Sequence, residues 1–418
     1  MSEDVYDIIV IGGGPSGMMA AGRAGELGAR VLLLEKNDRL GKKLSITGGR
    51  RCNITNAEYD NHLFLDSFPE SKQFLFSPFS QFNVESTFEF FEGRGLPLIV
   101  EERKRAFPKS QKAEDVCATL KKYVEESGNV TVKLSVTVES FVLIDKELKG
   151  VHTSVGEFRG SKIIVATGGL AAPETGSTGE GLSMLAQIGH KVDDPDPNLA
   201  PLRTSSKWVH QLSGVTLDDM TLRFMQNGKT AHKARGRLLF THFGISGPLV
   251  INSAHKVKTL LKQGSLTASV DLFPDHDLGS LDTFFIELFE QQKKKTLKNV
   301  LKEVLQKKLS ESVLNRQDLR IGDLPVHEIS REQRKLLVRT LKDLNFPITG
   351  TMGFEWSIVA DGGVEPKEVD FRSMTSRLFP NLYLIGDTLN INRPSGGFSL
   401  QLCWTTGWVA GTHAAQAD

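Results

Sequence analysis

The sequence contains little cysteine. Its 418 residues include only three cysteines, Cys52, Cys117 and Cys403, which are far apart and form no C-x-x-C motif. This spacing argues against a redox-active disulfide, and no cluster of His, Cys and carboxylate residues has the spacing of a zinc site. We therefore expect neither a catalytic disulfide nor a bound metal.

Excess charge of one sign and long hydrophobic runs are also absent. The chain has 51 Lys and Arg against 50 Asp and Glu, a net charge of +1, so no overall field attracts nucleic acid or an acidic membrane. No apolar run approaches the roughly 18–20 residues that span a bilayer, and the N-terminus lacks the pattern of a signal peptide. We therefore expect a cytoplasmic protein that acts on a small molecule, and the sequence leaves its oligomeric state open.

The first fifty residues carry a nucleotide-binding pattern. The apolar run Tyr6–Ile11 leads into Gly12-Gly-Gly14-Pro-Ser-Gly17, a helix-like stretch follows, and a second apolar run ends at Glu35. Gly12 permits the sharp turn, Gly14 lets the backbone approach a pyrophosphate, and Gly17 lets the helix pack on the sheet. The helix N-terminus favours phosphate, whereas Glu35 suits ribose hydroxyls and disfavours the 2′-phosphate of NADP. The pattern predicts a βαβ unit that binds a dinucleotide.

Three later segments resemble elements of FAD-binding flavoproteins with two dinucleotide-binding domains. Gly48-Gly-Arg-Arg-Cys-Asn53 resembles the glycine-rich segment that runs beneath the pyrophosphate toward the flavin ring. Ile163–Gly169 resembles their strand followed by Ala-Thr-Gly, and Asn381–Asp387 resembles their late Gly-Asp element. Their order along the chain favours FAD over NAD as the bound cofactor.

Composition divides the chain into four parts. Residues 1–194 and 351–418 have the alternating strand and helix patterns of one FAD-binding domain, whereas 195–275 contain short alternating runs typical of a β-barrel and 276–350 look helical. The Pro- and Asp-rich stretch 193–198 is predicted to be a linker, and Val130–Val138 a single strand. An apolar stripe over residues 297–309 predicts a helix, whose opposite face is rich in lysine.

The order of these motifs, together with Thr241-His-Phe-Gly-Ile-Ser-Gly-Pro248, resembles a family of bacterial NAD(P)/FAD-dependent oxidoreductases. This family includes aminoacetone oxidases and an NADH-dependent flavin reductase of bile-acid dehydroxylation. The resemblance implies an α/β fold with a discontinuous Rossmann-type FAD-binding domain that carries an inserted β-barrel and a helical subdomain. No second G-x-G-x-x-G motif is present, so NADH or NADPH would act as a transient reductant that docks over the flavin.

The resemblance also implies which residues hold FAD. They come from the segments described above and from Gly396–Ser399, where two glycines precede an apolar helix that we expect to face the flavin. On this basis a Gly397→Pro substitution would weaken FAD binding. The implied set is Gly12, Gly14, Pro15, Ser16, Gly17, Glu35, Lys36, Lys43, Gly49, Arg51, Cys52, Asn53, Val138, Ala166, Thr167, Gly168, Gly386, Asp387, Gly396, Gly397, Phe398 and Ser399.

No catalytic acid or base is evident from the sequence. The candidates, chosen by location only, are Arg50, Cys52, Asn53, His242 and Arg393. Arginines beside a flavin would suit an anionic substrate. Arg50 stands where family members commonly have a third glycine, and Asp387 where they usually have glutamate.

Three functions follow as hypotheses. The first is an FAD-dependent oxidoreductase on a small organic substrate, whose flavin is reduced by NAD(P)H or by an amine-type substrate. The second is a flavin-dependent RNA-modifying enzyme, against which the near-zero net charge argues. It would use the lysines of the helical part, Lys293, Lys294, Lys295, Lys298, Lys302, Lys307 and Lys308. The third is a flavin-binding protein without turnover.

Overall fold

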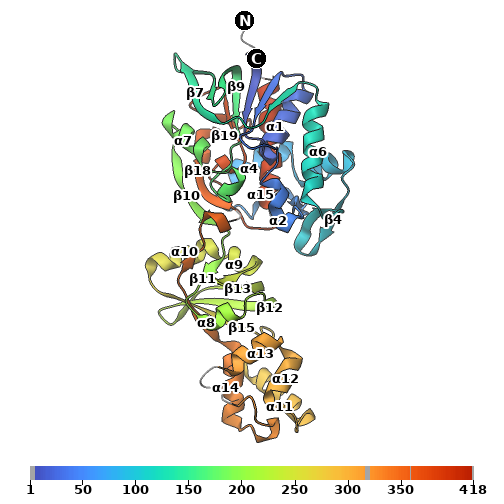
Figure 1. Ribbon diagram of the computed structural model, residues 1–418, viewed down its shortest axis with the longest axis vertical. Coiled ribbons are helices and arrows are strands. Elements are labelled where there is room, and N and C mark those ends of the chain that lie inside the picture. Colours follow the sequence, from blue (N-terminus) through green and yellow to red (C-terminus); the bar gives the residue numbers. More distant parts are fainter. Residues whose placement is uncertain (1–4, 316–320, 358, 417–418) are drawn as a thin grey trace. The chain divides into compact units, whose positions relative to one another are not determined.

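A computed structural model describes residues 5–315, 321–357 and 359–416, and the chain divides into two compact units (Figure 1). Unit 1 consists of Met1–Pro197 and Ser357–Asp418, and unit 2 of Asn198–Trp356. Each unit encloses its own hydrophobic core, and the two cores share no residue. Unit 1 is a discontinuous Rossmann-type domain, and unit 2 is the insertion within it.

The centre of unit 1 is a mixed sheet with the strand order β19-β20-β21-β9-β1-β2-β6. The strands β21, β9, β1, β2 and β6 run parallel, and β2 is buried along its whole length, as expected for a parallel sheet covered on both faces. Strands β7 and β8 extend β9 as antiparallel hairpins. The bounds of these strands are β1 Val5–Ile11, β2 Val31–Leu34, β6 Val130–Lys133, β7 Val138–Ile144, β8 Glu147–Thr153, β9 Gly156–Val165, β19 Val369–Asp370, β20 Thr375–Ser376 and β21 Leu382–Leu384.

Helix α1 (Pro15–Glu26) packs closely on the final helix, α15 (Phe398–Gln416). A Cβ atom at Gly411 would lie 2.5 Å from the Ala20 carbonyl oxygen, so glycine permits the two helix backbones to touch. The two ends of the chain thus form one layer beside the sheet (Figure 1). The other elements of unit 1 are α2 Thr47–Arg50, β3 Thr55–Asn56, α3 Asn61–Leu65, α4 Lys72–Gln81, α5 Val84–Gly93, β4 Leu98–Glu101, β5 Arg105–Pro108, α6 Ala113–Glu126, α7 Glu180–Gln187, β10 Val192–Asn198 and β18 Val359–Val364.

Unit 2 contains a seven-stranded sheet with the order β16-β15-β12-β13-β14-β11-β17. Its two outermost strands, β16 (Leu344–Ile348) and β17 (Gly350–Thr351), are separated by one residue, so the sheet closes on itself as a barrel. The amide of the intervening Thr349 donates to the Arg203 carbonyl at 2.9 Å and continues the ladder. The other barrel elements are β11 Leu202–Arg203, α8 Lys207–Gln211, β12 Thr216–Gln226, β13 Lys229–Phe240, β14 Gly244–Ser246, α9 Pro248–Ile251, α10 Ala254–Gln263 and β15 Leu266–Asp271.

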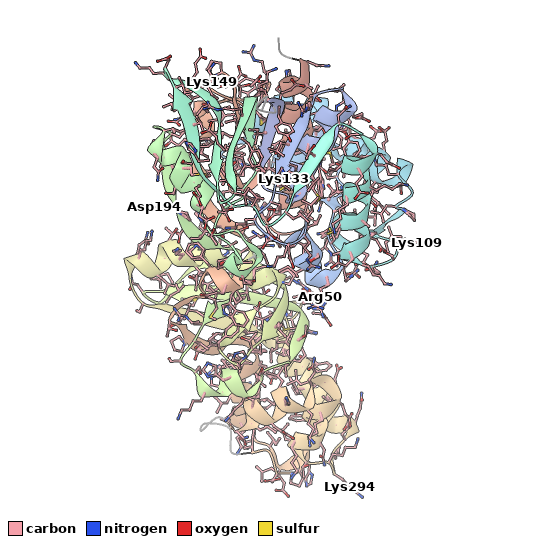
Figure 2. The ribbon with its side chains drawn as sticks, turned by 45° about the horizontal axis from the view of Figure 1, so that its top comes forward. Arg50, Lys109, Lys133, Lys149, Asp194 and Lys294 are labelled. Carbon is pink, nitrogen blue, oxygen red and sulfur yellow. The ribbon has the colours of Figure 1, made fainter. Side chains whose placement is uncertain are left out.

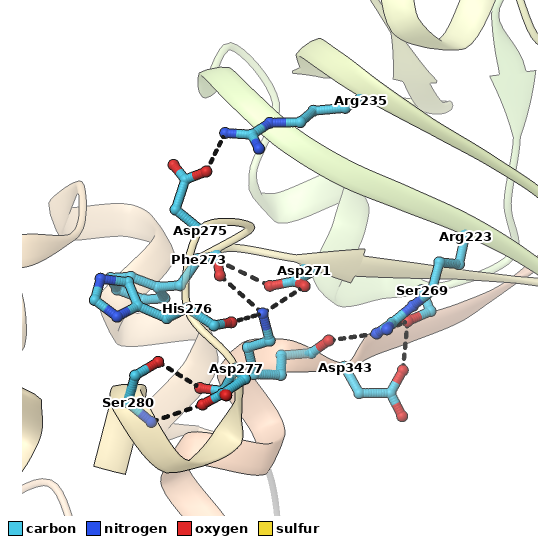
Figure 3. Close-up of polar contacts among 11 residues, drawn as sticks. Arg223, Arg235, Ser269, Asp271, Phe273, Asp275, His276, Asp277, Ser280 and Asp343 are labelled. Atoms are coloured by element: carbon cyan, nitrogen blue, oxygen red, sulfur yellow. Dashed lines mark hydrogen bonds and ion pairs between the residues drawn. The ribbon is translucent and has the colours of Figure 1, made fainter. Parts of the chain in front are cut away.

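A helical subdomain follows β15 and gathers at one end of the barrel (Figure 1). It consists of α11 (Leu278–Gln291), α12 (Leu297–Val304), α13 (Lys307–Leu314) and α14 (Arg331–Lys342). Figure 3 shows how polar contacts join it to the barrel. The ammonium of Lys342 pairs with the carboxylate of Asp271 at 2.7 Å and also donates to the Phe273 carbonyl at 2.8 Å.

Two stretches differ from the sequence-based expectation. The predicted strand Val130–Val138 is interrupted after β6, because Ser135 adopts a φ of 57° and the chain turns before β7 begins. The predicted linker 193–198 is wrong, because these residues form most of β10, which pairs with β18. Prolines are compatible with such a strand because a two-stranded sheet has free edges where no amide is required.

The lysine-rich helix predicted over residues 297–309 is two helices. Leu305 has an extended backbone, with φ −131° and ψ 151°, and separates α12 from α13. The apolar stripe nevertheless faces the core of unit 2, since Leu297, Val300, Leu301 and Leu309 are all buried.

Candidate functional site

The turn between β1 and α1 has the close contacts that its glycines predict. Gly12 has a φ of 104°, and a Cβ atom there would lie 2.6 Å from the Ala166 carbonyl oxygen at the end of β9. A Cβ atom at Gly17 would lie 1.9 Å from the Gly12 carbonyl oxygen. Gly14 is different, because a Cβ atom built there meets no other protein atom within 4 Å. The first and third glycines therefore serve packing, and the second lies where the backbone is approachable.

The N-terminus of α1 has no partner from a side chain. Its N-cap is Gly14, no side chain caps it, Pro15 stands in the first turn, and no acidic residue is found there. The free amides and the helix dipole favour an anion at this position. Ser16 is buried against Gly386, where a Cβ atom would lie 2.7 Å from the Ser16 hydroxyl oxygen.

Glu35 follows β2 and is almost fully buried. One carboxylate oxygen accepts from the Gly13 amide at 2.7 Å, and the other accepts from the backbone and side-chain amides of Asn37 at 2.8 Å and 2.7 Å. The carboxylate therefore fixes the glycine turn, and of its about four acceptor positions three are used. Sequence reasoning missed Asn37, which orients Glu35. The sequence feature that could have indicated this contact is an amide side chain two residues after the acidic residue.

The residues next to Glu35 contact two other segments of unit 1. Val136 donates its amide to the Glu35 carbonyl at 3.0 Å, so the residues leading to Val138, the first residue of β7, lie beside Glu35. Lys36 points to α7, where its ammonium pairs with Glu180 at 2.8 Å and donates to the Thr178 hydroxyl at 2.6 Å.

Five buried side-chain oxygen atoms lack a hydrogen-bond partner within the part of the chain that the structure describes, and two of them belong to segments that are expected to hold FAD. These two are Thr167 Oγ1, in the Ala166-Thr-Gly168 turn after β9, and Asn53 Oδ1, in the segment after α2. A buried polar atom without a partner costs free energy, so such atoms are rarely retained without a ligand or water. Together with the uncapped α1 and the open position at Gly14, they fit a bound dinucleotide.

Four of the five residues in Gly48–Cys52 have left-handed backbone angles, and Arg51, with a φ of −99°, is the exception. Gly48, Gly49, Arg50 and Cys52 have φ values of 57°, 67°, 68° and 59°. Arg50 is exposed (Figure 2) and makes no hydrogen bond or ion pair with another residue that the structure describes. A strained, exposed arginine of this kind is typical of functional sites.

Arg51 and Cys52 are occupied by structural contacts. The Arg51 guanidinium pairs with Glu101, donates to Gln111 and lies 4.1 Å above the Phe107 ring. Cys52 is fully buried, and this burial raises the pKa of its thiol to about 12. The thiol is therefore neutral at physiological pH.

The C-terminal segments converge on a buried ion pair. Arg393 pairs with Asp387, donates to the Ile391 carbonyl, and donates to the Ser399 hydroxyl at 2.8 Å. Each of its three guanidinium nitrogens thus has a partner within the fold, and the group is buried, so these contacts give Arg393 a structural role.

Lys43 lies near the same ion pair. Burial is the main cause that lowers the pKa of Lys43, opposed by the negative charge of Asp387. No hydrogen bond joins its ammonium to another described residue.

The glycines before α15 have a packing role. Gly397 has a φ of 103°, and a Cβ atom there would lie 2.2 Å from the Thr55 carbonyl carbon. Phe398 packs on Phe64 and Phe68, with ring centroids 4.9 Å and 5.9 Å apart. A Gly397→Pro substitution would therefore break the contact between α15 and β3, and its effect on FAD would not isolate the helix dipole.

His242 belongs to unit 2 and is not among the residues that unit 1 brings together. Its exposed ring contacts Phe243 and Trp356, with centroids 4.9 Å and 6.5 Å away. Within residues 5–315, 321–357 and 359–416, no group of three or more His, Cys, Asp or Glu residues could hold a metal. No helix in these residues is long and apolar enough to cross a membrane.

Comparison with known proteins gives a family and relatives that span nearly the whole chain. The model of the HI0933-like protein Rossmann domain matches residues 6–413. The chain is 30% identical over 410 residues to a 3-dehydro-bile acid delta(4,6)-reductase of Clostridium scindens, covering 97% of this chain and 98% of that protein. It is 29% identical over 411 residues to a ribosomal RNA dihydrouridine synthase of Escherichia coli, covering 97% and 96% of the two chains.

A solved structure with the same fold is the 3-ketosteroid delta1-dehydrogenase of Sterolibacterium denitrificans. Its TM-score is 0.58 at 14% identity, and the alignment covers 99% of this chain and 100% of that one. At this identity the likeness is one of fold.

Proposed function

We propose which reaction this chain catalyses, and we start from its family. The chain belongs to the HI0933-like protein Rossmann domain family. It is an FAD-dependent oxidoreductase, as its family and its full-length bile-acid reductase relative indicate. The proposed reaction is the reduction of a carbon–carbon double bond that is conjugated to a carbonyl group.

One observation supports this proposal. Two relatives with dissimilar substrates are both named for the same kind of reaction, the saturation of a carbon–carbon double bond. A delta(4,6)-reductase of a 3-dehydro bile acid saturates double bonds in conjugation with a ketone. A dihydrouridine synthase saturates the ring double bond of uracil, which is conjugated to a ring carbonyl. Both relatives match this chain over nearly its whole length, so the shared chemistry is the best-supported reaction for it.

Several residues of unit 1 have surroundings that would suit FAD. The uncapped α1 and the backbone at Gly14 suit the pyrophosphate, and the remaining acceptor position of Glu35 suits a ribose hydroxyl. The hydroxyl of Thr167 would donate or accept a hydrogen bond with the cofactor, and the Asn53 side-chain carbonyl oxygen would accept one. The ammonium of Lys43 would balance negative charge on it.

The reaction balances with a nicotinamide as the reductant. When bound, FAD would supply hydride transfer, with NADH or NADPH as the source of the electrons. The hydride adds to the β-carbon, the π bond breaks, and a proton adds to the α-carbon, so that each turnover consumes one NAD(P)H and one proton. The exposed guanidinium of Arg50 would anchor an anionic group of the substrate, a carboxylate or a phosphate.

The test is an anaerobic reaction followed through the visible absorbance of oxidised flavin. Addition of NADH or NADPH should bleach this absorbance, and subsequent addition of a 3-oxo-Δ4 steroid or a uridine-containing RNA should restore it. Mass spectrometry should detect a product that has gained two hydrogens. Bleaching by an amine but by neither nicotinamide would indicate an oxidase instead, and no bleaching by any donor would indicate a flavin-binding protein without turnover.

A further inference from the structure

A long loop follows strand β9 of unit 1. Residues 166–179 separate β9 from α7, and within them lies one short helical turn, Pro173–Thr175. Connections between strands and helices in α/β folds usually have about 2–6 residues, and much longer ones are often functional. We refer to residues 168–181, which include the first two residues of α7, as the strap.

The strap has several backbone positions in the left-handed region. Gly168, Gly176 and Gly179 have φ values of 73°, 105° and 80°, and Ala172 has a φ of 52°. Glycine adopts such angles at little cost, whereas alanine adopts them with strain. The strap therefore changes direction several times between β9 and α7, and glycine permits most of these bends.

The two ends of the strap lie against the turn that follows β9. A Cβ atom at Gly168 would lie 3.5 Å from the Ser177 hydroxyl oxygen, and one at Gly181 would lie 2.0 Å from the Thr167 hydroxyl oxygen. Thr167 Oγ1 is one of the buried oxygens without a partner in the described part of the chain. The strap thus packs beside a polar atom that is expected to face FAD.

The middle of the strap reaches the residues that follow β2. The side-chain amide of Asn37 donates to the Thr175 carbonyl at 3.1 Å and to the Glu35 carboxylate at 2.7 Å. A Cβ atom at Gly176 would lie 2.5 Å from Asn37 Nδ2, so glycine permits this close approach. Asn37 therefore joins the strap to the carboxylate that is proposed to hold a ribose.

A second contact with the end of β2 is an ion pair at the surface. The ammonium of Lys36 donates to the Thr178 hydroxyl at 2.6 Å and pairs with the Glu180 carboxylate at 2.8 Å. The side chains of Lys36 and Glu180 are 25% and 54% exposed, so the pair is open to solvent. Exposed pairs contribute little free energy, so this contact can open readily. We refer to Lys36, Thr178 and Glu180 as the latch.

The sheet order places the strap across the dinucleotide-binding turn. Strand β1 lies between the parallel strands β9 and β2, and its carboxyl end leads into the turn of residues 12–14. The strap begins after the carboxyl end of β9 and is held after the carboxyl end of β2, so it spans the edge of the sheet from which that turn emerges. In α/β folds of this kind a dinucleotide binds in the crevice at this edge.

We propose that the strap closes over the FAD bound at this turn and that the latch controls how fast FAD leaves. With the latch open, the Asn37 contact alone holds the strap against the residues after β2. Because the latch joins opposite charges at the surface, salt loosens it. This inference rests on the FAD binding of the proposed function and is independent of the reaction proposed there.

The test measures the release of FAD from the full-length protein. Released FAD is followed by its fluorescence after dilution of the FAD-loaded protein, for the wild type, K36E, E180K and the double variant K36E/E180K. The control is E147K, because Glu147 and Lys149 form an exposed pair in β8 that involves no residue of the strap.

We expect each single variant to release FAD on the order of fivefold faster than the wild type, because like charges then face each other in the latch. The double variant restores the pair with its charges exchanged, so its release rate should return to within about twofold of the wild type. E147K should also stay within about twofold. If Lys36 instead contacts FAD directly, the double variant would remain as fast as K36E, and the latch would be refuted.

The response to salt gives a second measurement. Release from the wild type should accelerate between about 0.05 and 1 M KCl, since screening weakens the exposed pair. The E180Q protein lacks the charge but keeps the shape of the side chain. It should release FAD about threefold faster than the wild type at low salt and respond less to KCl. Equal salt responses of the two proteins would overturn the proposal.

Hydrogen exchange distinguishes a strap that closes over FAD from a loop that only packs beside it. Addition of FAD to the apoprotein should slow amide exchange in residues 168–181 at least about threefold, because the closed strap opens less often. Exchange in the β12–β13 hairpin of unit 2 should change little and serves as the internal control. Unchanged exchange in the strap would overturn the proposal.

These measurements can fail separately from the proposed reaction. A working latch in a protein that reduces no conjugated double bond would refute the reaction alone. Reduction of such a bond by a protein whose FAD release is the same in K36E, E180K and the wild type would refute the latch alone.

Discussion

The backbone of Arg50 is in the left-handed region, with a φ of 68°. This conformation costs a residue with a Cβ atom roughly 1–2 kcal/mol and costs glycine little. A glycine, which the family resemblance implies at this position, would adopt the same conformation without strain. The sequence shows the departure from glycine, but only the backbone angle shows that the arginine is strained.

We therefore predict that Arg50→Gly stabilises the protein by about 1 kcal/mol, as measured by urea unfolding of the apoprotein. Lys112→Gly is the control, since Lys112 has an ordinary φ of −122° and a glycine there should give no gain. If Arg50 binds an anionic substrate group, the same variant should raise KM while leaving FAD content unchanged. A less stable R50G protein would contradict the strain argument.

The cysteines give a second prediction at the residue scale. All three are buried, and burial raises the pKa of Cys52 to about 12 and that of Cys117 to about 11. Because the thiolate is the reactive form, none should be alkylated in the native protein near neutral pH. Iodoacetamide labelling followed by mass spectrometry should find three modified cysteines after denaturation and none before. Rapid native labelling of Cys52 would return it to the set of catalytic candidates.

At the scale of elements, the glycines of the turn between β1 and α1 have two different roles. One permits tight packing, and the other leaves the backbone open to a ligand. Gly17 has no room for a Cβ atom, whereas Gly14 has open space around it and an ordinary φ of −78°. Gly14→Ala should therefore leave the unfolding free energy of the apoprotein nearly unchanged. It should lower FAD affinity at least about tenfold, because the added methyl group occupies the position where the pyrophosphate approaches.

Flavin content after purification and a fluorescence titration with FAD would measure this effect. Gly17→Ala serves as the matched control, and it should reduce stability itself, because the nearest backbone oxygen would be 1.9 Å away. Full FAD binding by the G14A protein would show that the cofactor does not approach this turn.

The contact between α11 and α14 predicts a pH dependence. Arg334 holds both carboxylate oxygens of Asp282, at 2.7 Å and 3.1 Å, and this hydrogen bonding lowers the pKa of Asp282 below its usual range. A lowered folded-state pKa contributes stability above the unfolded pKa of about 3.9, and this contribution is lost as the pH falls through the folded pKa.

Asp282→Asn should accordingly cost about 1 kcal/mol at about pH 7, and this cost should shrink as the pH falls below the unfolded pKa of about 3.9 towards the lowered folded pKa. Urea unfolding of the wild type and the variant over this pH range is the measurement. A cost independent of pH would mean that packing, rather than charge, is what the carboxylate supplies.

Elements that local chemistry determines could be predicted from the sequence, and those that depend on distant partners could not. The β1–α1 turn and the strand before Ala166 follow from apolar runs and glycines. Strand β10 was missed because its Pro- and Asp-rich sequence is typical of a linker, and only its pairing with β18, far along the chain, makes it a strand. The contacts of Arg51 and Arg393 were likewise invisible, since their partners depend on the folded chain.

At the scale of the whole molecule, the two units have separate cores, and unit 2 is one continuous segment inserted into unit 1. The pairing of β10 with β18 brings the two ends of unit 1 together at the insertion point. Glu365 donates its amide to the Lys191 carbonyl at 3.2 Å, and a Cβ atom at Gly362 would lie 2.5 Å from the Asp194 carbonyl oxygen. A short linker could therefore replace unit 2 without strain in unit 1.

We predict that a chain in which a short Gly-Ser linker replaces residues 198–356 folds and retains FAD, because every residue proposed to hold the cofactor lies in unit 1. Its flavin absorbance should still be bleached by NADH or NADPH. Residues 198–356 expressed alone should unfold cooperatively in urea, because unit 2 has its own hydrophobic core. A folded, flavin-free deletion protein would contradict the prediction, because it would mean that unit 2 supplies part of the cofactor site.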